Sequence, residues 1–257
     1  MDRIVYRNPS HRPRPAWPEF EVPLPVTIAG ALEESRQNTA FLWRHGLPSV
    51  PAQGNAARMQ QPGFIAFHGF SCRDQERFLA ALDALPESVR NHLVPLLREV
   101  HLVDALPPEV EGATMVREGV VVLNRKALAG ADEKAHARPP TQLQQWVHRA
   151  IDKKTDRHWR QVVVHEVSHL HDWSLGEGNH FLSELEPGPL GQAPFVSWYA
   201  AAASERGQVC EDMAETATAL AELRWKHGRT WKCHAKDSPH AAKFEHVMSR
   251  YWKGETP

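Results

Sequence analysis

Apolar side chains recur every three or four residues in the middle of the chain, and this spacing predicts a helix from about Asp156 to Trp173. The apolar positions are Trp159, Val163, Val167, Leu170 and Trp173. Thr155 is a candidate N-cap, and Gly176 follows the expected end of the helix. We therefore expect a helix that packs one face against the core.

Three consecutive valines, Val162 to Val164, leave a strand as the alternative. β-Branched side chains lower helix propensity and are common in buried strands. In a strand, two side chains four residues apart would share a face but lie about 13 Å from each other. The helical spacing continues well past the valines, so a helix is the better interpretation.

A second apolar stripe predicts a helix that opens at the segment Glu211 to Glu215 and ends near His227, before Gly228. Its apolar positions are Val209, Met213, Ala217, Leu220 and Ala221. In this helix Glu211 and Glu215 lie one turn apart on the same face.

Upstream of these helices, short strands alternate with helices. Expected helices cover Gln75 to Leu85 and Glu87 to Leu97, and expected strands cover Gly63 to Phe70, Glu99 to Ala105 and Gly119 to Asn124, the last after a turn at Glu111 to Ala113. Mixed strands followed by helices predict an α+β fold with a small mixed sheet.

The first 62 residues differ from the rest because proline recurs through them, at positions 9, 13, 15, 18, 23, 25, 48, 51 and 62. Proline at this density favours an extended chain, apart from a helix predicted around Ala29 to Arg44. We expect a proline-rich N-terminal segment over residues 1–62 and one folded domain over residues 63–257, which is long enough to bury a core.

The clearest chemistry in the chain is the motif His165-Glu166-Val167-Ser168-His169 on the first predicted helix. Positions four apart on a helix lie on one face, so both imidazoles can bind a single metal ion, with Glu166 beside its open side. The motif therefore predicts a zinc site with His165 and His169 as ligands.

Zinc at a catalytic site takes a third protein ligand and keeps a position for water. Glu211 is the candidate ligand, and Glu215 is placed to accept the outer ring N–H of a ligand histidine. The alternative is that Glu211, Glu215 and Glu222 form a solvated helix face. A metzincin-type extension is excluded, because its glycine and third histidine are replaced by Asp172 and Leu175.

The combination of this motif with a later glutamate on a second helix resembles the gluzincin metallopeptidases. The finer pattern, Ser197-Trp198-Tyr199-Ala200 followed by Glu211-Asp212-Met213-Ala214-Glu215, resembles the peptidase domain of anthrax lethal factor and related bacterial zinc peptidases. The resemblance implies a zincin-like domain with zinc metalloendopeptidase activity, in which Tyr199 stabilises the oxyanion. An ordinary half-buried tyrosine is the alternative for that residue.

In such an enzyme, zinc would lower the pKa of a bound water to about 7, and Glu166 would act as general base and return the proton to the leaving amine. No cofactor besides Zn²⁺ is expected. The strand at Val120 to Asn124 is the candidate edge strand for an extended protein or peptide substrate. Such a run is also typical of a buried strand.

A formal charge of -1 and a pI near 7.0 give no electrostatic reason to expect binding to nucleic acid or to an anionic membrane. The sequence shows neither a secretory signal nor a membrane-spanning stretch. We therefore expect synthesis as a cytoplasmic protein, with delivery as a toxin or effector by a dedicated export machine left open by the resemblance.

Two other classes of protein stay open. The chain could be a catalytically inactive zincin-like module for binding or regulation, or a helical protein in which a short motif arises by chance among 16 histidines. The presence of Glu166 argues against the first class. The later pair of glutamates argues against the second.

Overall fold

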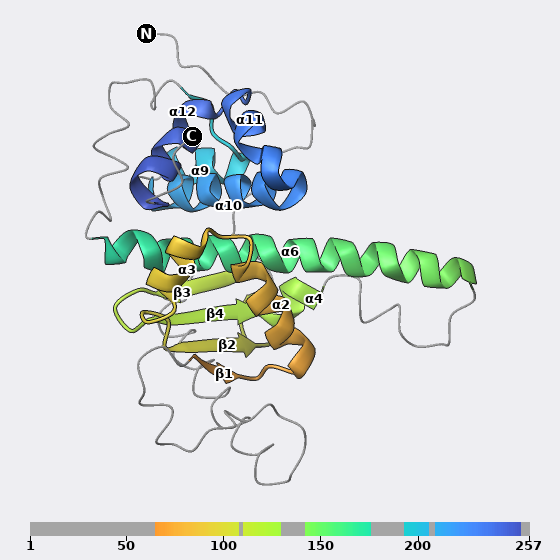
Figure 1. Cartoon of the computed structure of the whole chain (residues 1–257). Helices are drawn as coiled ribbons and strands as arrows, with labels where there is room; N and C mark the ends of the chain where they lie inside the picture. Colours follow the sequence, from red (N-terminus) through yellow and green to blue (C-terminus); the bar gives the residue numbers. More distant parts are fainter. Residues whose placement is uncertain (1–64, 108–109, 130–141, 176–192, 206–208, 253–257) are drawn as a thin grey trace.

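The structure is a computed structural model that describes residues 65–107, 110–129, 142–175, 193–205 and 209–252, with only the helical backbone of residues 142–153. It has an α+β fold in which a four-stranded sheet packs against helices (Figure 1). The predicted proline-rich segment, including its helix at Ala29 to Arg44, lies outside the described residues. No described helix combines the length and the apolar character that crossing a membrane requires.

The sheet has the strand order β1-β2-β4-β3. Its strands are β1 at Ala66–His68, β2 at Glu99–Val103, β3 at Gly112–Met115 and β4 at Val120–Asn124. β1, β2 and β4 run parallel, and β3 pairs antiparallel with β4. The turn between β3 and β4 ends at Gly119, whose φ of 69° is a left-handed conformation that glycine adopts readily.

The edge strand differs from the predicted one. Val120–Asn124 is an interior strand with every residue buried, because its side chains enter the main core on one face and a second apolar cluster on the other. The outer position belongs to Gly112–Met115, which includes two of the residues expected in a turn. Glycine and alanine are poor strand formers, but pairing with the apolar β4 overrides their preference.

Two helices connect β1 to β2, α2 at Cys72–Leu82 and α3 at Glu87–Leu93, and the short α4 at Arg125–Ala129 follows β4. α2 lies three residues before the predicted helix, and α3 starts as predicted but ends four residues early, at Leu93. α2 begins at a capping box, in which Ser71 Oγ accepts the backbone N–H of Asp74 and the Asp74 carboxylate accepts the backbone N–H of Ser71.

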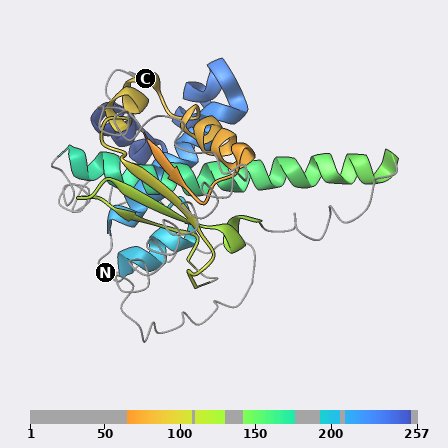
Figure 2. The same cartoon turned by 90° about the horizontal axis from the view of Figure 1, so that it is seen from below.

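Helix α6 spans Gln142–Ser174 and lies between the sheet and the C-terminal helices (Figure 1), and its N-terminal part extends past the other helices and strands (Figure 2). The helical interpretation of the valine run is confirmed. Its buried apolar positions include Trp159, Val163, Val167 and Leu170. Two details of the prediction are wrong. Thr155 lies inside the helix because residues 142–154 contain no proline or glycine to interrupt it, and Trp173 is 44% exposed in the last turn.

The C-terminal helices form a layer on the other side of α6 (Figure 1). Their bounds are α9 at Trp198–Glu205, α10 at Val209–His227, α11 at Trp231–Lys236 and α12 at Ala241–His246, with a 3₁₀ turn (η1) at Gly228–Thr230 and a π-helical turn (η2) at Val247–Tyr251. The predicted end of α10 at His227 is confirmed. Gly228 follows it with a φ of 51°.

A buried ion pair joins α12 to α10. Lys243 Nζ lies 2.7 Å from Asp212 Oδ2, and both side chains are almost completely buried. Burial lowers the pKa of Lys243 and raises that of Asp212, against the opposing effect of each partner. Because either charge alone would be costly in the core, the pair restricts the orientation of α10.

Candidate metal centre

Two histidines of α6 and one glutamate of α10 converge where these helices pack. His165 and His169 lie one turn apart, and their Nε2 atoms are 3.2 Å from each other. Glu211, in the first turn of α10, places its Oε2 3.1 Å from Nε2 of His165 and 3.5 Å from Nε2 of His169. The structure thus brings together the three residues predicted as metal ligands, here named the helical site.

The three ligand atoms are spaced like those of a metal coordination shell. Zinc bonds of about 2.0 to 2.2 Å at tetrahedral angles place ligand atoms about 3.3 to 3.6 Å apart. The observed separations of 3.1, 3.2 and 3.5 Å are close to that range. All three side chains are partly exposed, so solvent reaches the site.

His165 is held on its other side by a second glutamate. Glu215 Oε1 lies 2.9 Å from Nδ1 of His165, and Ser197 hydrogen-bonds to Glu215. A carboxylate can only accept, so Nδ1 carries the proton and Nε2 is left to face the metal position. This contact is the one expected of Glu215 from the sequence.

Glu166 is 6% exposed, and residues of β3 fix its carboxylate. Thr114 Oγ1 lies 2.7 Å from Glu166 Oε2 and 2.9 Å from the Glu166 backbone oxygen. Gly112 permits this approach, because a Cβ there would lie 2.7 Å from Glu166 Oε1. Burial raises the pKa of Glu166 above its ordinary value, and the nearby imidazoles of His165 and His169 oppose that rise.

The helical site is a network of coupled ionisable groups. Burial acts to lower the pKa of His165, but hydrogen bonds to Glu211 and Glu215 outweigh it and raise that pKa to about 9. Burial acts on His169 in the same way, and hydrogen bonds to Cys210 and Glu211 raise its pKa well above the ordinary value. Burial would raise the pKa of Glu211, yet the two imidazoles hold it well below its usual range. The site therefore attracts positive charge.

Tyr199 lies beside the candidate ligands. It is the second residue of α9, and its ring centroid is 6.1 Å from that of His165. Ser197 Oγ accepts the backbone N–H of Ala200 and so caps α9. The same serine that supports Glu215 therefore also sets the start of the helix that carries Tyr199.

Gly112, Thr114 and Ser197 shape the site, but the sequence assigned none of them a role there. A glycine and a threonine in a strand have no special role by themselves. Gly112 and Thr114 matter because β3 packs beside Glu166. Ser197 offered a usable signal, because a serine before the small residues Ala200 to Ala203 is typical of a helix start.

Within the described residues, two groups of histidine and glutamate side chains could hold a metal ion: the helical site, and His68, Glu99 and His101 in the sheet. Comparisons of the chain with models of protein families, with curated proteins and with solved structures find no match. The side chains themselves are therefore the basis for assigning a function.

Proposed function

We propose that the chain is a zinc-dependent metallopeptidase of the gluzincin type, with His165, His169 and Glu211 as zinc ligands. Two imidazoles and one carboxylate form a donor set that suits zinc and leaves a position for water. The observation that carries the proposal is the position of Glu166, a buried carboxylate next to the ligands that Thr114 holds in place. A site that only stored metal would not need that group.

The arrangement of elements supports a zincin-like fold. The helix with both histidines packs along the antiparallel edge strand of the sheet, and the third ligand comes from a later helix. The gluzincins and the lethal factor-like peptidases, which the sequence motifs resemble, combine the same parts: a small mixed sheet, an active-site helix and a glutamate helix.

Zinc, when bound, would lower the pKa of a water ligand and polarise the substrate carbonyl. Glu166 would accept the proton of the attacking water and pass it to the leaving amine, and its raised pKa suits it to both transfers. The hydrogen bond from Thr114 keeps the carboxylate in one orientation during these steps. Tyr199, beside His165, would donate its phenolic hydrogen to the oxyanion.

The outer edge of β3 is the surface on which we place an extended substrate. β3 pairs with β4 on one side, and no described strand pairs with its other side. The backbone groups of that edge can hold a protein or peptide chain by strand addition. Gly112 and Thr114 on this strand contact Glu166, so a segment added there would lie close to the general base.

A Glu166→Gln variant tests this function. The amide keeps the shape of the side chain and removes the base, so the variant should bind about one zinc at the helical site and cleave about a thousandfold more slowly. Mass spectrometry would identify new termini in a denatured proteome, and elemental analysis would measure zinc. Glu76→Gln, at an exposed position of α2, is the matched control.

Cleavage by Glu166→Gln at the wild-type rate would contradict the assigned base. A wild-type chain that binds no zinc after zinc has been supplied would contradict the metal site. Zinc binding at the helical site without any cleavage by the wild-type chain would instead indicate the inactive zincin-like binding module.

A further inference from the structure

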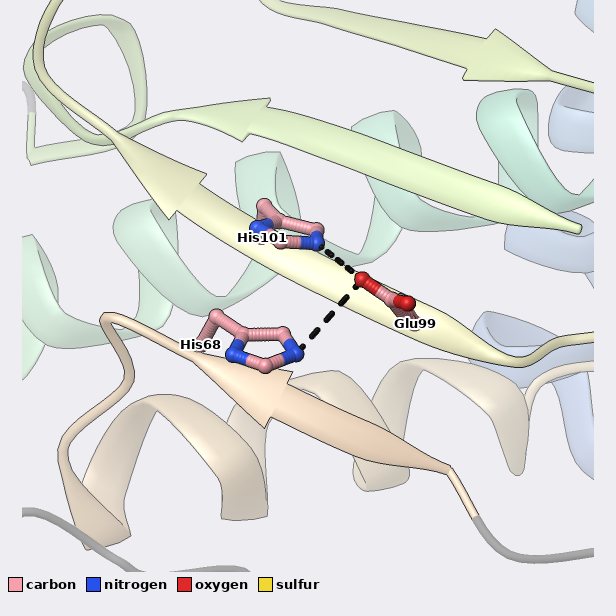
Figure 3. A group of neighbouring side chains, drawn as sticks. All are labelled: His68, Glu99 and His101. Carbon is pink, nitrogen blue, oxygen red and sulfur yellow. Dashed lines mark hydrogen bonds and ion pairs between the residues drawn. The ribbon is translucent and has the colours of Figure 1, made fainter. Parts of the chain in front are cut away.

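The sheet carries a second group of three side chains, His68, Glu99 and His101, here named the sheet site. Figure 3 shows that they project from neighbouring strands on one face. His68 of β1 and His101 of β2 are paired in parallel register, and Glu99 precedes His101 by two residues on β2. Strand pairing alone therefore brings the three side chains together.

Strand alternation places the sheet site on the face opposite α6. Val100 and Leu102 of β2 enter the core that α6 shares, so Glu99 and His101 point the other way. The partner of His101 on β4 is Val122, which belongs to the second apolar cluster. The sheet thus separates this group from the helical site.

The polar atoms of the sheet site converge on one carboxylate oxygen. Glu99 Oε2 lies 2.8 Å from Nε2 of His101 and 3.6 Å from Nε2 of His68. The two imidazole rings stack with their centroids 4.4 Å apart and their planes 16° apart, and both Nε2 atoms point toward Glu99 (Figure 3). The candidate ligand atoms of the three residues all lie within 4.8 Å of one another.

His101 can donate its Nε2–H to Glu99, but protonating both imidazoles would be unfavourable. The side chain of His101 is fully buried and that of His68 is 15% exposed. Two stacked imidazolium rings would repel each other beside a single carboxylate. A divalent ion would instead meet two neutral imidazole nitrogens and one carboxylate oxygen. These donors suit zinc or another late first-row metal, whereas Ca²⁺ and Mg²⁺ prefer oxygen ligands.

We propose that His68, Glu99 and His101 bind a divalent transition metal ion that fixes the edge strand β1 to β2. The Glu99 side chain is 31% exposed, which gives the ion a route from solvent. Binding requires Glu99 Oε2 and His101 Nε2 to separate by about 0.5 Å, which a small rotation of the carboxylate provides. β1 has only three residues, so a metal link to β2 would strengthen its attachment.

Zinc binding by a chain without the helical site tests this proposal separately from the peptidase function. Full-length His165→Ala/His169→Ala protein, stripped with a chelator and reloaded with zinc, should retain about one zinc per chain. Adding His101→Ala should abolish that binding. Adding His92→Ala instead should leave it intact, because His92 hydrogen-bonds to Ser174 outside both sites.

A Glu99→Gln change in the same His165→Ala/His169→Ala chain distinguishes loss of zinc binding from a folding defect. It keeps the side-chain size, so the circular dichroism spectrum should stay the same while zinc binds at least tenfold more weakly. At a zinc concentration about a hundred times Kd, the Tm of the His165→Ala/His169→Ala chain should rise by about 5 °C, and Glu99→Gln should reduce this rise. A chain lacking the helical site that binds no zinc, or binds it equally with and without His101, overturns the proposal.

Discussion

The helical site and the sheet site offer the same three donors, two imidazoles and one carboxylate, but the protein positions them differently. In the helical site the candidate ligands come from α6 and α10, so their geometry depends on how two helices pack. Glu215 and Thr114 then fix the groups around them. In the sheet site the backbone pairing of β1 with β2 sets the geometry.

The two roles that we propose, catalysis and structural support, follow from this difference. The helical site has a buried carboxylate, Glu166, that lies beside the ligands without being one of them, and a proton acceptor is therefore at hand. In the sheet site the carboxylate of the group, Glu99, is itself a candidate ligand. We expect changes around the helical site to alter reaction rate, and changes in the sheet site to alter stability.

The largest contrast between the sites should come from Glu211→Ala, which removes the candidate ligand on α10. Zinc affinity at the helical site should fall more than a hundredfold, since losing an outer-shell partner alone costs about ten- to a hundredfold. The sheet site should keep its affinity. Titration calorimetry would resolve the two sites, with Glu245→Ala at an exposed position of α12 as control. Equal affinities in both variants would show that Glu211 is not a ligand.

Gly112→Ala should affect the helical site through β3. The new methyl group would lie 2.7 Å from Glu166 Oε1 and displace the carboxylate, so kcat/KM should fall about a hundredfold while zinc stays bound. Peptide hydrolysis and zinc content measure the two effects. The next residue, Ala113, packs on the other face of the sheet, so the control variant Ala113→Gly should lower the rate far less. Wild-type activity in Gly112→Ala would argue against Glu166 as the base.

Thr114→Val should have a smaller effect, a loss of about tenfold in kcat/KM. In the wild type, the Thr114 hydroxyl donates to Glu166 Oε2 and thereby lowers the pKa of that carboxyl. The change removes this hydroxyl. Without the donor the pKa of Glu166 rises further, so the acidic limb of the pH–rate profile should move to higher pH. Thr114→Ser should restore the profile, and an unmoved limb in Thr114→Val would contradict this positioning role.

A change of pH is the mildest test of the helical site, because it alters no residue. The pKa of His165 is raised to about 9 without metal, and the imidazolium must lose its proton before Nε2 can bind zinc. Zinc affinity at this site should therefore increase as the pH rises toward about 9. Calorimetry in buffers of different ionisation enthalpy would count the protons released, and binding without proton release at neutral pH would contradict this expectation.

The stability of the metal-free chain should change in the opposite direction. A folded-state pKa raised from 6.5 to about 9 means that protonated His165 stabilises the fold fully below pH 6.5, and that this contribution is lost as the pH rises through 9. The lowered pKa of Glu211 makes its contribution present above pH 4.5 and lost on acidification. Urea unfolding at a series of pH values, in the presence of a chelator, measures both contributions to the free energy of unfolding.

The helices of the helical site could be predicted because each carries its own periodic apolar stripe. The helical spacing also brought Glu215 within reach of a ligand histidine. The edge strand could not be identified, because Gly112–Met115 has no strand pattern of its own and forms by pairing with β4. The contact between Thr114 and Glu166 follows from that pairing, so it could not be predicted from the sequence either.

The sheet site was missed for a related reason. His68 and His101 lie on different strands, and only the parallel register of β1 with β2 makes them neighbours. A helical motif is readable because its spacing is local, whereas a register between strands is set by the whole fold. Glu99 and His101 lie two residues apart on β2, the ordinary spacing of neighbours on one face of a strand. The sequence therefore gives them no distinctive signal.

Ligands on both α6 and α10 would also link distant parts of the folded chain. A metal ion shared by His165 and Glu211 would close a loop between residues 46 positions apart. All three cysteines of the chain are free thiols, so no disulfide supplies such a closure. Because the ion binds the folded site far better than the unfolded chain, its binding free energy would stabilise the fold while it links the last third of the protein to its centre.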